Sequence, residues 1–369
     1  MFPCLWGFVL NHKYYKITME INSAEKDLQT FIKNMPKIEL HAHLNGSLNH
    51  DTVQKLIDLK TKQNNEDNIK IPSLSSNNLA ECFKVFGLIH EITDSPEAIY
   101  MATCEVIEDF YKDGVKYLEL RTTPKENDWF TTQEIYVQTV LKAIEDICFQ
   151  KCTEMSVKLL LSVDRGRNEK YAQETLRIAE QYFTSTSSIV GVDLSGNPKS
   201  GDMSYLIPHL EHAKKSGLKL AVHISEVPGN FEEVEALLNL KPDRLGHGTY
   251  LHPQKGGSAK NFNLLKSLKI PLEFCLTSNV ISKTVPSYEK HHFTLFTEMN
   301  YPCILCTDDK GIFNTSLSNE YYLASKYYSL SKDDLFDLSQ SGIDYIFSNE
   351  TIKHDLKIFW KNYNYTQVV

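Results

Sequence analysis

Eight short runs rich in apolar and β-branched residues recur along this chain, and stretches with the periodicity of amphipathic helices separate them. The runs are residues 37–43, 115–121, 157–164, 189–196, 218–226, 243–247, 270–279 and 302–309. Strands that alternate with helices form parallel sheets, because each crossover returns the chain to the same edge. Eight units at a usual spacing of roughly 25 to 40 residues favour a closed barrel. The pattern therefore predicts the α/β class and a (β/α)8 TIM barrel.

The main alternative for such a pattern is an open, doubly wound sheet. The first turn of that fold normally holds a phosphate with a glycine-rich loop. This sequence contains neither a G-x-G-x-x-G motif nor a P-loop, which supports the barrel.

The first crossover is exceptionally long. Residues 44–114 separate the first two runs and include the polar tract 61–78, so we expect two or three extra helices there and a loop over the barrel mouth. We also expect extra helices at the C-terminus, after Ser316. No internal repeat or linker divides the chain, so residues 23–369 are expected to form a single barrel domain.

The longest apolar stretch, residues 2–10, is too short to span a membrane, which takes about 20 residues. Polar residues follow it, in place of the small residues of a signal-peptide cleavage site. We therefore expect residues 1–22 to be a disordered extension, and we expect no membrane partner.

The charge balance restricts the partners. The chain has 39 Lys and Arg against 47 Asp and Glu, a formal charge of −8, and no basic block, which argues against a nucleic-acid polymer. A small anionic ligand needs only a few local donors and stays open. Eight cysteines in 369 residues are too sparse for a disulfide scaffold, so reduced thiols and a cytoplasmic location are expected. We expect a monomer that binds a small molecule.

Chemically active side chains gather at the C-terminal ends of the expected strands, where α/β barrels build their active sites. The polarity of ordinary loops does not explain why four histidines and two adjacent aspartates are among them. These residues are His41, His43, His223, His247, Asp308 and Asp309.

The histidines predict a metal site. His41 and His43 are two positions apart on one expected strand, so both side chains point into the barrel. One such pair is weak evidence, because histidines also pack in protein cores. His223 and His247 end two further strands, and closure of the barrel brings Asp308 beside the first strand. Imidazoles with one carboxylate suit one Zn²⁺ per chain, with a position left for water.

A second zinc motif is formally present. His209 and Glu211, followed later by Cys303 and Cys306, match the H-x-E and P-C-x-x-C signature of cytidine-type deaminases. The two cysteines are an odd number of positions apart on an apolar strand, so they face opposite sides. His209 and Glu211 lie on an expected helix, and we reject this alternative.

At these residues the sequence resembles the adenosine deaminase family of zinc-dependent (β/α)8 hydrolases. The resemblance covers residues 36–350, and its motifs are ELHAHLNGS at 39–47, HISE at 223–226, GHG at 246–248, LTSN at 276–279 and CTDD at 306–309. It implies a single zinc-dependent deaminase domain over residues 23–369. It also implies that His41, His43, His223 and Asp308 hold the metal.

The resemblance further implies roles in catalysis. Glu226 would donate a proton to purine N1, His247 would orient and deprotonate the metal-bound water, and Asp309 would hydrogen-bond N7. His43 and the backbone amide of Gly196 would also contact the substrate. These residue types suit the reaction, because attack at C6 needs a protonated N1 and a partly buried glutamate keeps its proton near neutral pH. The alternative for Glu226 is an exposed loop carboxylate.

One position departs from the usual family pattern. Adenosine deaminases that act on the nucleoside usually carry an aspartate where this chain has Asn45. A neutral amide does not repel a 5′-phosphate and offers it a donor. With the segment Arg121, Thr122, Thr123 and Pro124, this feature is similar to the subgroup that converts N6-methyl-AMP to IMP and methylamine. Arg121 and the threonines are expected to face the phosphate, with a solvated loop as the alternative.

Two further nucleotide contacts are implied by the subgroup, at His90 and Asp164. The alternatives are a histidine packed at the edge of the core and a cap of a loop. His291 and His292 also match the subgroup, and the sequence assigns them no role.

The leading functional prediction is therefore hydrolytic deamination of N6-methyl-AMP. A deaminase of free adenosine is the first alternative, and Asn45 argues against it. A nucleoside-binding protein without activity is the second. A binder has no need of the proton donor and activated water that Glu226, His247 and Asp309 imply.

Overall fold

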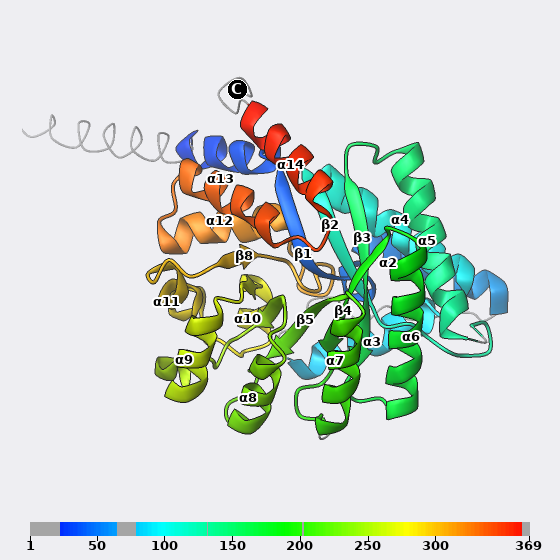
Figure 1. The fold of residues 1–369 in the computed structure, drawn as a ribbon. Helices are drawn as coiled ribbons and strands as arrows, with labels where there is room; N and C mark the ends of the chain where they lie inside the picture. Colours follow the sequence, from blue (N-terminus) through cyan, green and yellow to red (C-terminus); the bar gives the residue numbers. More distant parts are fainter. Residues whose placement is uncertain (1–22, 65–78, 131, 201–202, 364–369) are drawn as a thin grey trace, which may run out of the picture.

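The computed structural model describes residues 23–64, 79–130, 132–200 and 203–363 (Figure 1). The expected N-terminal extension, residues 1–22, and most of the expected mouth loop, residues 65–78, lie outside the described residues.

Eight parallel strands form one sheet at the centre of the molecule. Their order in space is their order in the sequence, from β1 to β8. The bounds are β1 Lys37–His43, β2 Val115–Thr122, β3 Ser156–Asp164, β4 Ile189–Ser195, β5 Lys219–Ile224, β6 Arg244–His247, β7 Leu272–Phe274 and β8 Cys303–Leu305.

The sheet closes just beyond β8. Ala42 on β1 and Asp308 form a parallel bridge, and the Asp308 amide donates to the His41 carbonyl at 2.7 Å. The His43 amide donates to the Asp308 carbonyl at 3.0 Å. The predicted (β/α)8 barrel is confirmed, including the approach of the last strand to the first.

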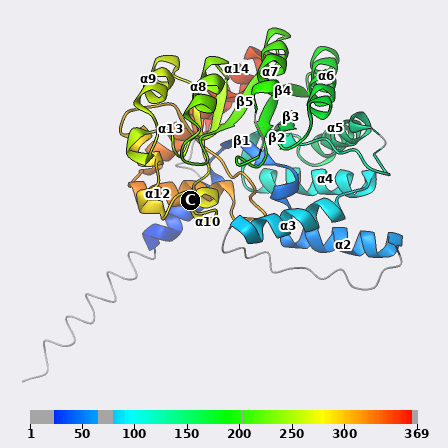
Figure 2. The same cartoon turned by 90° about the horizontal axis from the view of Figure 1, so that it is seen from below.

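Helices surround the strands in Figures 1 and 2. Residues 23–34 are helical as well. The remaining α-helices are α2 His50–Asn64, α3 Leu79–Ile92, α4 Pro96–Lys112, α5 Gln133–Gln150, α6 Glu169–Ser185, α7 Ile207–Lys215, α8 Phe231–Asn239, α9 Ala259–Leu268, α10 Leu276–Ile281, α11 Phe293–Thr297, α12 Leu317–Tyr328, α13 Lys332–Ser341 and α14 Glu350–Asn362.

The predicted extra helices are present. The first crossover contains α2, α3 and α4, and Figure 2 shows α2 and α3 beside α4 at one edge of the barrel. Three helices follow Ser316, and α13 packs against β8 and β1. No helix in the described parts of the chain is long and apolar enough to cross a membrane.

Local sequence explains where these helices begin and what they bury. The Ser95 hydroxyl accepts from the Ala98 amide and caps α4, and Pro96 occupies its first turn. Apolar side chains such as Ile99, Val106 and Phe110 recur at helical spacing and are buried against the barrel.

The last two strands are shorter than the predicted residues 270–279 and 302–309. Residues 276–279 begin the helix α10 instead of ending a strand, and β8 ends at Leu305. The amide of Thr277 donates at 3.1 Å to Glu320, a buried carboxylate on α12, which anchors the first turn of α10. Contacts from distant parts of the chain therefore decide the local structure at this end of the barrel.

The two cysteines of the rejected zinc motif lie in different hydrophobic clusters, which agrees with the prediction that they face opposite sides. Cys303 packs in the core cluster between the sheet and the helices, whereas Cys306 belongs to a separate cluster with Ile38 and Ile304. His209 lies on α7 and contacts Glu169 at 2.7 Å near the surface.

Candidate active site

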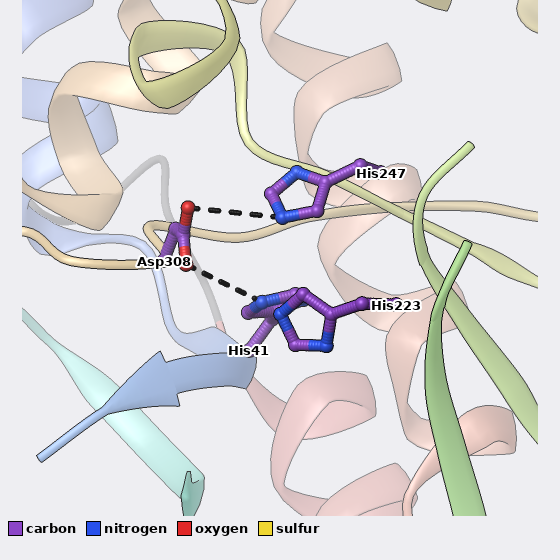
Figure 3. Close-up of side chains that lie close together, drawn as sticks. All are labelled: His41, His223, His247 and Asp308. Atoms are coloured by element: carbon purple, nitrogen blue, oxygen red, sulfur yellow. Dashed lines mark ion pairs between the residues drawn. The ribbon is translucent and has the colours of Figure 1, made fainter. Parts of the chain in front are cut away.

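Four side chains from different strand ends face one another at the mouth of the barrel. Figure 3 shows His41 from β1, His223 from β5, His247 from β6 and Asp308, which follows β8. One nitrogen or oxygen of each lies within 4.8 Å of the others. The distances from Asp308 are 3.4 Å from Oδ1 to His41 Nε2 and 3.8 Å from Oδ2 to His247 Nε2.

His43, at the end of β1, also contacts two members of this group. Its Nε2 lies 3.3 Å from His223 Nε2 and 3.5 Å from Asp308 Oδ1. The Nε2 atoms of three histidines and one carboxylate oxygen therefore converge, with 3.3 to 3.5 Å between the pairs measured. Ligand atoms around a tetrahedral zinc at 2.0–2.1 Å lie about 3.3–3.4 Å apart, so this donor set fits the ion.

The surroundings of His41 support the same conclusion. Its Nδ1 lies 2.7 Å from Glu273 Oε2, which accepts its proton and leaves the Nε2 lone pair directed at the cluster. That Nε2 is buried and has no hydrogen-bond partner among the described residues. A buried imidazole nitrogen without a partner is costly unless it binds something that the site is built to hold.

His223 is oriented in the same way. Its Nδ1 lies 3.1 Å from both Asp193 Oδ1 and the Leu194 carbonyl. Burial alone would raise the pKa of the Asp193 carboxyl, but His223 and Arg121 hold it well below its usual range. Carboxylates behind two histidines therefore fix which nitrogen faces the cluster.

Asp308 is held by its backbone and by α10. Its φ is +63°, in the left-handed region, and Ser278 Oγ donates to its Oδ2 at 2.6 Å. Burial would raise the pKa of this carboxyl, but contacts with His41 and His247 hold it well below its usual range. Strained backbone of this kind is typical of functional sites.

Two other carboxyl groups beside the cluster have pKa values that are raised, in contrast to that of Asp308. Burial, together with the charge of Asp308, raises the pKa of Glu226. The same two causes raise the pKa of Asp309 well above its usual range. Asp309 packs so tightly against Gly46 that a Cβ there would lie 1.6 Å from Asp309 Oδ1. Both groups are therefore suited to donate protons or hydrogen bonds to a substrate.

A narrow pocket opens beside these groups. His223 and Glu226 line it together with Arg165, Pro198 and Val234. Glu226 Oε1 also lies 3.9 Å from His247 Nε2, so Glu226 connects the pocket with the histidine cluster. The arrangement can hold a metal, position a water and deliver a proton at one point.

A model of the protein family described as adenosine deaminase matches residues 36–358. This chain belongs to the adenosine deaminase family. The family prediction from the sequence is thereby confirmed.

Several relatives match nearly the whole of this adenosine deaminase-family chain. A Danio rerio protein called N6-Methyl-AMP deaminase is 47% identical, covering 91% of this chain and 97% of its own. A Homo sapiens protein of the same name is 44% identical, covering 90% and 94%. A crystal structure described as Arabidopsis ADAL complexed with IMP is 36% identical with a TM-score of 0.83, covering 92% of this chain and 99% of its own.

The predicted metal ligands of this family member lie close together but fall into two overlapping groups. His41, His223 and Asp308 group with His247, whereas His43 groups with His223 and Asp193 and also lies 3.5 Å from Asp308 Oδ1. His247, predicted to act on the water, lies slightly farther from Asp308, at 3.8 Å from its Oδ2.

The loop after β2 lies beside the end of β1, and both segments contain residues predicted for the phosphate site. The Leu44 amide donates to the Arg121 carbonyl at 2.8 Å, which places Asn45 next to this loop. The Thr122 hydroxyl lies 2.7 Å from the Tyr136 hydroxyl. The buried Oδ1 of Asn45 has no hydrogen-bond partner among the described residues.

Beyond Thr122 the loop turns toward α6. The Pro124 carbonyl accepts from the Tyr171 hydroxyl, and Thr123 is half-buried. The next residue, Lys125, donates to the Thr93 carbonyl at 2.9 Å at the end of α3 and is not free for a ligand.

The prediction for the Arg121 side chain is wrong. Its guanidinium is fully buried inside the barrel, where it donates to Asp193 at 3.0 Å, to Glu273 at 2.5 Å and to the Leu40 carbonyl at 2.7 Å. It therefore cannot meet a phosphate at the mouth. Alternate residues of a strand face the same side, and Arg121 shares the inward face with Tyr117 and Glu119.

The other predicted substrate residues lie around the mouth. Asp164, at the end of β3, accepts from the Gly166 amide at 2.8 Å. Gly196 has a φ of +107°, and a Cβ there would lie 2.3 Å from Asp164 Oδ1, so only glycine fits. His90 is exposed on α3, and its carbonyl accepts from Lys125 at 3.3 Å beside the β2 loop.

Sequence reasoning missed the residues behind the cluster. A charged residue inside an apolar run was the available signal for Asp193 and Glu273, because such a residue must be paired when it is buried. Ser278 and Asn279 were included only in the LTSN motif at the end of an expected strand, and His291 and His292 received no role. No local signal connects these four residues with Asp308 and His247.

Proposed function

We propose that this chain hydrolyses N6-methyl-AMP to IMP and methylamine, and more generally acts on N6-substituted purine 5′-monophosphates. Support comes from relatives named N6-Methyl-AMP deaminase at 44–47% identity over 90–91% of the chain. The similar Arabidopsis structure described with IMP supports the product. The observation that carries the proposal is the convergence of three imidazole nitrogens and Asp308 Oδ1 beside Glu226 and Asp309, two carboxyls whose pKa values are raised.

The metal in this proposal is one Zn²⁺, held by His41, His43, His223 and Asp308. The buried, unpartnered Nε2 of His41 and the spacing of the donor atoms support the assignment. When bound, zinc lowers the pKa of a coordinated water toward about 7 and supplies a nucleophile near neutral pH.

The side chains then provide the remaining steps. Glu226 donates its proton to purine N1 while the oxygen of one water bonds to C6. One proton of that water passes to N6, the C6–N6 bond breaks and methylamine leaves, so that the ring becomes that of IMP. The other proton of the water returns to Glu226, so one water is consumed for each turnover and Glu226 ends in its protonated form. Asp309, which keeps its proton in this site, donates a hydrogen bond to N7. The Gly196 amide contacts the purine, and His247 contacts the attacking water.

The substrate's 5′-phosphate lies at the mouth in this proposal. Asn45, Thr122 and Thr123 face it, and its charge meets no carboxylate where nucleoside enzymes of the family usually carry aspartate. His90 and Asp164 complete the nucleotide site from α3 and the end of β3.

We further propose that residues 23–369 act as one domain and that the protein is a cytoplasmic monomer. The six cysteines whose side chains are described are all free thiols, which suits a reducing compartment. Sedimentation of the purified chain tests its oligomeric state, and imaging of a tagged chain tests its compartment.

The activity is tested with zinc-loaded protein and N6-methyl-AMP. We expect IMP and methylamine to appear in equal amounts, measured by mass spectrometry and an amine assay. Asp308→Ala serves as the control, because it removes a ligand, and we expect it to lose both zinc and turnover. Wild-type protein that holds zinc and releases no methylamine would overturn the proposal, and full zinc occupancy in the variant would overturn the ligand assignment.

A further inference from the structure

Asn279 and His292 contact His247, and His291 contacts Asn279; all three residues are buried. Asn279 Nδ2, on α10, lies 3.2 Å from His247 Nδ1. His291 Nε2 lies 3.1 Å from Asn279 Oδ1. His292 stacks on His291 with 4.3 Å between ring centroids, and its Nε2 lies 2.8 Å from the His247 carbonyl. The neighbouring histidines therefore reach His247 by two routes, His291 through the Asn279 side chain and His292 through the His247 main chain.

The direction of these hydrogen bonds is set at one end by a backbone amide. The Phe293 N–H, which can only donate, points to His291 Nδ1 at 3.0 Å. That nitrogen is therefore an acceptor and carries no proton. The single proton of the neutral His291 ring must then be on Nε2, which makes Nε2 the donor toward Asn279.

The side-chain amide of Asn279 lies between His291 and His247, so its orientation determines which group faces His247. Its Oδ1 accepts from His291, so its Nδ2 is the atom that faces His247. Thr284 agrees with this orientation, because its hydroxyl donates its proton to the main-chain carbonyl of Asn279 at 3.1 Å and accepts from Nδ2 at 3.3 Å. An amide NH₂ can only donate, so His247 Nδ1 is an acceptor.

His247 must then carry its own proton on Nε2. This nitrogen points into the active site, 3.8 Å from Asp308 Oδ2 and 3.9 Å from Glu226 Oε1. The backbone of His247 is in the left-handed region, with a φ of +60°, and the bond from His292 to its carbonyl holds it there. Both the ring and the main chain are fixed in one orientation.

We propose that Asn279 and His291 are positioning residues that keep His247 in its Nε2–H form. In that form His247 donates a hydrogen bond to the oxygen of the attacking water and does not remove its proton. The role in catalysis rests on the proposed function, whereas the position of the proton on His247 does not.

The position of the proton is measured on zinc-loaded protein labelled with ¹⁵N-histidine, without substrate. Long-range ¹H–¹⁵N correlations distinguish a protonated Nε2 from a protonated Nδ1, and His247→Gln identifies the signals of His247 by their loss. We expect a directly bonded proton on Nε2 and none on Nδ1. A proton on Nδ1 of the wild-type residue would overturn the proposal, whatever the protein's substrate is.

Asn279→Asp tests whether the Asn279 amide determines which nitrogen of His247 is protonated. Aspartate has the shape of asparagine but presents an acceptor to His247 Nδ1, so we expect Nδ1 to become protonated in the same spectrum. An unchanged spectrum would mean that Asn279 does not determine the proton's position.

His291 is tested with a matched pair of variants. His291→Phe removes the donor to Asn279, and we expect kcat on N6-methyl-AMP to fall about tenfold with KM and zinc content unchanged. His291→Gln keeps a donor for Asn279 and an acceptor for the Phe293 amide, so we expect it to restore kcat to within about threefold. Equal losses of kcat in both variants, or no loss in either, would contradict the role of His291 as a positioning residue.

Discussion

Replacing Arg121 with methionine tests the correction to the predicted phosphate site. The guanidinium joins the two carboxylates that orient the ligand histidines, since it donates to Asp193 behind His223 and to Glu273 behind His41. Methionine has a similar length and no charge. It leaves both carboxylates buried without this counterion.

The expected losses of stability and of zinc affinity follow from the burial of these charges. Removing one partner of a fully buried ion pair destabilises a protein by about 3–5 kcal/mol. With about 2.1 cal/mol/K of unfolding entropy per residue, a chain of this size loses about 4–7 °C in Tm. Zinc affinity is expected to fall about 10- to 100-fold, because groups that orient metal ligands contribute that much.

Calorimetry measures the change in Tm, and competition with a chelator measures the zinc affinity. Lys37→Met is a control, because Lys37 is also fully buried but donates to the Ile32 and Met35 carbonyls, away from the metal cluster. We expect the control to lower Tm and to leave the zinc affinity unchanged.

Substrate comparison separates the two roles for Arg121. We expect Arg121→Met to lower kcat/KM by the same factor for 5′-monophosphates and for nucleosides. A selective loss of about 10- to 150-fold on monophosphates, with Tm unchanged, would mean that Arg121 contacts the phosphate and would refute the reasoning.

Three further predictions test single side chains, two carboxyl groups and one amide. Glu226→Gln should keep zinc and KM but lower kcat about a hundredfold or more, because an amide cannot deliver a proton to N1; turnover near wild type would mean that another group is the donor. Asn45→Asp should lower kcat/KM on monophosphates at least about tenfold relative to nucleosides, because a carboxylate repels the phosphate, and an unchanged ratio would remove Asn45 from the phosphate site. Burial raises the pKa of Glu320 from 4.5 to about 7, so the folded state binds this proton more tightly than the unfolded state does. The free energy of unfolding should therefore fall by up to about 1.4 kcal/mol per unit as pH rises from about 4.5 to about 7, and urea titrations of Glu320→Gln should lack this contribution, whereas the same slope in wild type and variant would contradict it.

The barrel and the centre of the site were predictable because both depend on periodicity along the chain. Alternation of strands and helices predicts a parallel barrel, and barrel closure places Asp308 beside His41 and His43. Each of these steps follows from local sequence and one rule of topology.

The residues around the centre were harder to predict because they depend on contacts between distant segments. Residues 276–281 form α10 because Glu320, more than 40 positions away, holds Thr277. Asn279 contacts His247 across 32 positions, and no sequence pattern indicates this pairing. The inward direction of Arg121 was accessible in principle, because it follows Glu119 at strand spacing.

The central claim is that the substrate is an N6-substituted purine monophosphate, and one comparison of rates tests it most directly. The measurement is kcat/KM of the zinc-loaded protein for methylamine release from N6-methyl-AMP and from N6-methyladenosine, under the same conditions. We predict a preference of about 10- to 150-fold for the monophosphate, as expected for charge-assisted contacts to one phosphate. Equal values, or a preference for the nucleoside, would contradict the account.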